Sequence, residues 1–127
     1  MPKVARFTVV PDSDGGKELG AAAASSDVHF QDISAPDIDR RAHAVLTFRV
    51  NPKGTTPVTL RMRIQNASGN TEVVNWSFDT APQRGWQEIL PPGALAAMGN
   101  ELIVSASGPG SLSIYDVVIW YQADIQS

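Results

Sequence analysis

A strict alternation of apolar and polar residues marks residues 58–65 as a β-strand. Val58, Leu60, Met62 and Ile64 fall on one side of an extended chain, and every residue between them is polar. Successive side chains of a strand point to opposite faces, so this period of two places one face in a core and the other in water. The segment is therefore predicted to be a half-buried strand of an antiparallel sheet.

Other short apolar runs, each bounded by turn residues, predict further strands. They cover residues 4–10, 28–31, 42–50, 74–78, 86–90, 102–106 and 112–121. The run 42–50 and the run 58–65 are predicted to be neighbours, because only a short turn of residues 51–54 and a few more residues separate them. The last strand is apolar on both faces near residues 117–120, which predicts a central position.

The remaining segments are predicted to be loops. Residues 17–26 contain four consecutive alanines but are flanked by glycine and serine, so a long loop with at most one helical turn is expected. Residues 93–98 are predicted to form one helical turn that Gly99 ends in a left-handed conformation.

Eight or nine short strands without alternating helices predict an all-β fold, a sandwich or a barrel, in one domain spanning residues 1–127. The predicted core consists of the inward-facing residues of these strands. Its members are Leu46, Phe48, Leu60, Met62, Ile64, Val74, Trp76, Phe78, Leu102, Val104, Ile114 and Val118.

Composition and charge narrow the possible environments and partners. The net charge of −3 argues against nucleic acid as a partner, and no run of apolar residues is long enough to span a membrane. Cysteine is absent, which excludes disulfides, and the first residues lack the apolar run of a signal peptide, so a cytoplasmic location is favoured.

Three segments of the second half resemble galactose-binding-like jelly-roll domains, a fold that many carbohydrate-binding modules share. They are residues 85–95 with Trp86 and the Pro91-Pro92 stop, residues 99–104 with a Gly-Asn turn, and residues 112–119 with the pattern isoleucine, x, aspartate, apolar, x, apolar. The resemblance implies an antiparallel β-sandwich of jelly-roll type. It implies little about function, because this fold hosts sugar binders, protein binders and structural domains.

The candidate ligand-binding residues are Arg49, Arg61, Arg63 and Asn75, with Trp86 as a further candidate. If the first two of the regular strands pair, the three arginines share one face, and guanidinium forks and amides suit sugar hydroxyls or carboxylates. The alternative is a solvated face with solubilising charges. Trp86 is a candidate stacking platform or a core residue, whereas Trp120 is expected in the core like Trp76.

The sequence gives little support for a metal site or for catalysis. Asp12 and Asp14 carry oxygen ligands of the kind calcium prefers, but the segment departs from the EF-hand pattern, so a plain turn is favoured and no cofactor beyond a possible structural calcium is expected. The only histidines, His29 and His43, belong to no triad or zinc pattern, so an enzyme is not expected.

The sequence therefore predicts a non-catalytic binding module, with a glycan or another small polar ligand as its partner, bound through a sheet face. The alternative is a structural or assembly protein. Apolar residues on both faces of the last strand leave hydrophobic surface to cover, which predicts a homo-oligomer.

Overall fold

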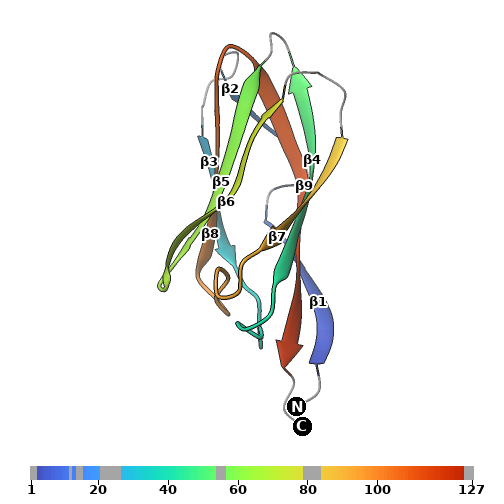
Figure 1. Ribbon diagram of the computed structural model, residues 1–127, viewed down its shortest axis with the longest axis vertical. Helices are drawn as coiled ribbons and strands as arrows, with labels where there is room; N and C mark the ends of the chain where they lie inside the picture. Colours follow the sequence, from blue (N-terminus) through green and yellow to red (C-terminus); the bar gives the residue numbers. More distant parts are fainter. Residues whose placement is uncertain are drawn as a thin grey trace.

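The part of the chain that the structure describes folds into nine strands in two antiparallel sheets. Figure 1 shows how the strands are arranged. The computed structural model describes residues 3–11, 13, 16–20, 27–53, 57–78 and 84–124, and none of these forms a helix. The strands are β1 (Lys3–Val9), β2 (Lys17–Gly20), β3 (Asp27–Ile33), β4 (Ala44–Lys53), β5 (Val58–Asn66), β6 (Gly69–Phe78), β7 (Arg84–Leu90), β8 (Asn100–Ser107) and β9 (Ser111–Asp124). The predicted all-β sandwich of jelly-roll type is confirmed.

The two sheets have different strand orders. The five-stranded sheet runs β1-β9-β4-β7, with β2 also paired to β9, and the four-stranded sheet runs β3-β8-β5-β6. The long strand β9 is central, as its two apolar faces predicted. The expected pairing of residues 42–50 with residues 58–65 is wrong, because β4 and β5 lie in different sheets.

The core fills the space between the sheets. The alternation in β5 is confirmed, since Leu60, Met62 and Ile64 are buried while Arg61 and Arg63 are exposed. Of the twelve predicted core residues, ten are buried. The two exceptions, Trp76 and Val118, have separate causes.

Val118 lies on the outer face of the five-stranded sheet because β9 contains a bulge. Asp116 has a φ of 56°, and the register between β4 and β9 shifts at this point. One extra residue in a strand exchanges the faces of all residues after it. Ile114 before the bulge is therefore buried, and after it Val117 and Ile119 take the core positions instead of Val118.

Three predicted connecting segments differ from the structure. Residues 17–20 form β2, whose Leu19 is fully buried, whereas residues 21–26 lie outside the described part. Strand β4 continues to Lys53 through the expected turn. Residues 93–98 form turns and bends rather than a helical turn, although Gly99 does have the positive φ expected there, 71°.

Ion pairs join the end of the β1–β9 strand pair at which β1 begins and β9 ends. Lys3, which lies opposite Asp124 in the register, binds Asp39 and approaches Asp124 to 2.8 Å. The Lys3 ammonium and the backbone N–H of Arg41 lower the pKa of Asp39 to about 2. Within the described residues, no helix could span a membrane.

Candidate functional site

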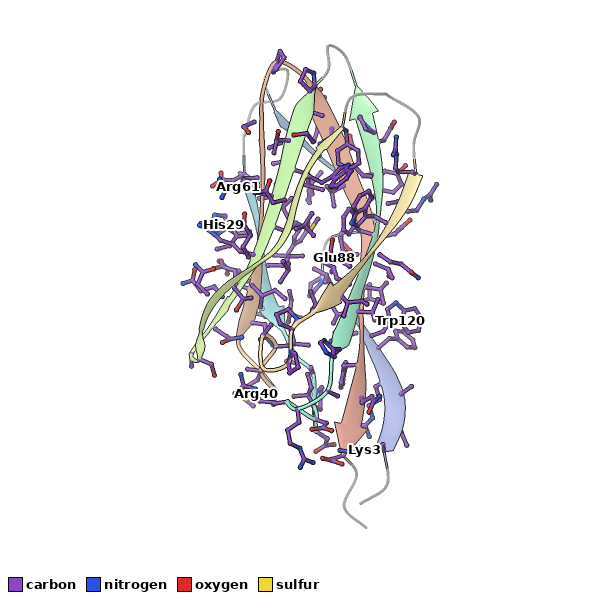
Figure 2. All side chains as sticks on the ribbon, viewed as in Figure 1. Lys3, His29, Arg40, Arg61, Glu88 and Trp120 are labelled. Atoms are coloured by element: carbon purple, nitrogen blue, oxygen red, sulfur yellow. The ribbon has the colours of Figure 1, made fainter. Side chains whose placement is uncertain are left out.

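The outer face of the four-stranded sheet carries two of the predicted arginines. Arg61 lies opposite Ser105 on β8 and Asn75 on β6, while Arg63 lies opposite Ile103. Directly opposed residues of antiparallel strands point to the same side, so these side chains share one surface. We call this surface, together with Asp27 and His29 of β3 and Glu72 of β6, the arginine face. In Figure 2, Arg61 and His29 lie together on the side of the sandwich away from Trp120.

A hollow of about 340 Å³ lies on the arginine face. Its polar lining comes from Asp27, Arg61, Arg63, Asn70, Glu72 and Ser105, and Ile103 is also part of the lining. Ile103 is only 5% exposed although its side chain is on the outer face, so the polar residues around it cover it. The hollow thus combines hydrogen-bonding groups around its wall with an aliphatic contact.

Charges of both signs alternate across the arginine face. Arg61 donates from Nε to Glu72 at 3.0 Å, and the His29 ring lies between Glu101 at 3.1 Å and Asp27 at 3.5 Å. Arg63 makes no hydrogen bond or ion pair with any residue that the structure describes. Its five guanidinium donors are therefore available to a ligand in the hollow.

Arg49 does not belong to this surface. It lies on β4 in the five-stranded sheet, where it pairs with Asp116 at 3.3 Å and stacks over the Tyr115 ring at 4.8 Å. The expectation that the three arginines share one face is wrong, because it required β4 and β5 to be neighbours. Arg61 also has an acidic partner, Glu72, which the sequence pattern did not reveal.

Trp86 points toward the interior from β7, the edge strand of the five-stranded sheet. It is half-buried, and its ring lies 5.5 Å from that of Trp76 and 5.6 Å from that of Phe78, both on the facing edge strand β6. We call these three rings the aromatic edge. Trp86 donates its indole N–H to Glu88 at 3.3 Å.

The aromatic edge explains why the core prediction for Trp76 is wrong. Trp76 lies opposite the buried Leu60 and so is on the inner face, yet it is 51% exposed. Both β6 and β7 are edge strands, so an inward side chain there closes the open side of the sandwich and still meets water. Glu88, also inward on β7, lies between the sheets in Figure 2.

Asn100 has a structural role. It is 1% exposed, and its amide hydrogen-bonds Asn66, Ile33 and the backbone of Ala96. The loop around Asn100 therefore offers no free amide to a ligand.

The two candidate calcium ligands, Asp12 and Asp14, lie outside the described residues. Among the residues that are described, no group of three or more acidic, histidine or cysteine side chains could hold a metal ion.

Comparisons with known proteins agree with this architecture. No protein-family model and no curated protein sequence matches the chain. Solved structures do match. A mutant of a family 29 carbohydrate binding module has a TM-score of 0.60 at 11% identity, with 94% of this chain and 92% of that chain covered. The fold is that of carbohydrate-binding modules.

Two further structures extend this result. The xylan-binding module CBM15 has a TM-score of 0.58 at 13% identity, with 98% of this chain and 100% of that chain covered. The apo structure of BiXyn10A CBM1 has a TM-score of 0.55 at 20% identity, with 91% of this chain and 79% of that chain covered. Identities this low describe a shared fold and leave the ligand of this chain to be argued from its own residues.

Proposed function

We propose that the protein is a non-catalytic binding module that holds a glycan on the arginine face. The observation that carries this proposal is the hollow lined by Arg61, Arg63, Asn70 and Glu72, on a fold shared with carbohydrate-binding modules. The solved structures reported above give no support to the alternative, a purely structural role.

The chemistry of the hollow suits sugar hydroxyls. Each hydroxyl is both a donor and an acceptor, and the wall presents guanidinium and amide donors beside the carboxylates of Asp27 and Glu72. Arg63 can form a two-pronged hydrogen bond with neighbouring oxygens without giving up a partner among the described residues. It could equally pair with the carboxylate of an acidic sugar, so both neutral and acidic glycans belong among the candidates.

The arginine face also predicts weak binding. Among the described residues, its apolar lining consists of Ile103, Met62 and the aliphatic stems of the arginines, because the inward tryptophans of the aromatic edge lie elsewhere. Shallow polar sites without an aromatic stack bury little apolar surface. We expect dissociation constants between about 1 μM and 1 mM, or roughly −8 to −4 kcal/mol.

Screening on a glycan array, followed by titration calorimetry, tests the proposal. The parent is expected to bind a defined set of glycans, and the double variant Arg61→Ala/Arg63→Ala is expected to lose at least tenfold in affinity. Arg49→Ala is the matched control, because it removes an equally exposed arginine from the opposite sheet. It should bind like the parent.

Two results would count against the proposal. If no glycan binds, the function is wrong. If binding survives the double variant and is lost in Trp76→Ala, the ligand lies on the aromatic edge instead, where the half-exposed Trp76 ring lies 5.5 Å from that of Trp86, the partner of Glu88.

A further inference from the structure

An apolar band crosses the outer face of the five-stranded sheet, on the side of the molecule opposite the arginine face. One row of the sheet places Phe7, Trp120, Val45 and Ile89 side by side across β1, β9, β4 and β7, and the next row adds Val9 and Val118. Ile89 is 66% exposed, Phe7 59%, Val9 54% and Trp120 46%. Trp120 projects from this side of the sandwich in Figure 2.

The polar groups within the apolar band are satisfied internally. Trp120 donates its indole N–H to the Thr47 hydroxyl at 3.0 Å, and Thr47 donates to the Val118 carbonyl at 3.4 Å. Removing water from Trp120 and Thr47 therefore leaves neither of these two donors unpaired, and an unpaired polar group is the main cost of burying one. The Phe7 and Trp120 rings are tilted by 42° and do not form a flat stacking platform. A band centre whose Trp120 and Thr47 donors are already used within the chain suits a dry protein contact better than a sugar.

We propose that the apolar band is the centre of a symmetric dimer interface, in which two copies of the chain pack back to back through their five-stranded sheets. Sheets that face each other pack with their strands about 30° apart, so two identical twisted faces are compatible. A two-fold interface uses the same patch on both copies.

The size of the face fits a second copy. The five strands of the sheet hold about 40 residues, and each residue covers about 16 Å² of the sheet plane, because strands lie about 4.8 Å apart and rise about 3.3 Å per residue. The flat footprint is therefore about 650 Å². Side chains stand out of that plane and add accessible surface, so the face is of the same order as the roughly 800 Å² per partner of a standard interface.

The charges of the face also permit self-association. Arg49 is paired with Asp116, and Lys3 with Asp124 and Asp39, so these charges near the apolar band are neutralised within one copy. Two identical faces can then approach without a large like-charge repulsion. An apolar centre containing aromatic rings and a polar surround, here with Gln87 and Gln122, is the usual composition of such interfaces.

The dimer would give the proposed glycan sites a defined arrangement, a consequence that rests on the proposed function. Each copy would turn its arginine face outward on opposite sides of the pair. Two sites that point in opposite directions would bind two separate glycan chains rather than two positions on the same chain.

Sedimentation at high micromolar concentration tests the dimer without reference to any glycan. The parent is expected at twice the chain mass of 13.6 kDa. Ile89→Lys and Val9→Lys place charges in the apolar band at positions that are more than half exposed, so both should fold and sediment at the chain mass. Met98→Lys is the matched control, since Met98 is 74% exposed in the loop before β8, outside the apolar band, and its variant should remain a dimer.

Thermal melting of each variant confirms that it is folded before its mass is interpreted. A parent that is strictly monomeric at high micromolar concentration would overturn the proposal. This holds even if another protein covers the apolar band. A dimer that persists in both lysine variants would overturn the proposal as well. Glycan binding by the monomeric Ile89→Lys variant would show that the arginine face works alone, which separates failure of the dimer from failure of the proposed function.

Discussion

Replacing Asn100 by leucine is expected to destabilise the fold more than most single substitutions. The side-chain amide uses its full hydrogen-bonding capacity. Its oxygen accepts from Asn66 Nδ2 at 2.9 Å and from the Ala96 N–H at 2.8 Å, and its nitrogen donates to the carbonyls of Ile33 at 2.9 Å and Ala96 at 2.8 Å. Asn100 thereby ties the end of β3, the β5–β6 hairpin and the loop before β8 to one buried point.

The expected loss in the free energy of unfolding follows from these four hydrogen bonds. A hydrogen bond contributes about 1 kcal/mol net, and a buried group left without a partner costs about 1–3 kcal/mol. Leucine is of similar size but removes all four bonds, and it leaves the Ala96 N–H and the Ile33 carbonyl without their partner. We expect the free energy of unfolding to fall by about 4 kcal/mol, which corresponds to a loss of roughly 15 °C in Tm for a domain of this size.

Equilibrium urea denaturation of the parent and of Asn100→Leu measures this loss. Asn75→Leu is the matched control, because Asn75 is exposed on the arginine face, and its effect should stay within about 0.5 kcal/mol. The slope of the unfolding transition must be unchanged for the two values to be compared. A loss below about 1 kcal/mol for Asn100→Leu would refute the view that this amide organises the loop.

Two further predictions concern the ends of the five-stranded sheet. Asp39 has a folded pKa of about 2, below its ordinary value of 3.8, so its contribution to stability is complete above that ordinary value and is lost as the pH falls through about 2. In Asp39→Asn, the free energy of unfolding near neutral pH should be lower than in the parent and should fall less steeply between pH 4 and pH 2. If urea titrations show the same fall between pH 4 and pH 2 in the variant and the parent, the prediction is wrong. Gly20→Ala should lower the Tm markedly and weaken the β2–β9 pairing, because Gly20 has a φ of +114° and a Cβ there would lie 2.6 Å from the Gly110 carbonyl oxygen. Amide exchange in β2 as slow as in the parent would contradict that reasoning.

The local pattern of the sequence predicted strands well where the two faces of a strand meet different environments. Strand β5 is the clearest example, because its inner residues contact the core and its outer residues meet water along the whole length. Strand β9 shows where this reasoning fails. A single residue in the left-handed region, Asp116, exchanges the two faces, and a run that is apolar on both faces does not reveal at which residue this happens.

The candidate site was harder to predict because it depends on which strands are neighbours. Arg61 and Arg63 could be placed on one face from their spacing alone, since both belong to β5. Adding Arg49 required knowing whether β4 and β5 share a sheet, and a short connection allows the chain either to turn back within a sheet or to cross to the other one. Trp76 was assigned to the correct face, but its exposure depends on β6 being an edge strand, which is a property of the whole sheet.

The antiparallel pairing of β1 with β9, which brings Lys3 opposite Asp124, also determines how the molecule responds to mechanical force. A pulling force applied between these two positions acts across the strand pair and loads its hydrogen bonds one after another, starting from the Lys3 end. Strands that are pulled lengthwise past each other share the load over all their bonds, whereas strands peeled in this way do not. We therefore expect a sandwich stretched between residues 3 and 124 to begin unfolding at low force, by release of β1 from the five-stranded sheet (Figure 1).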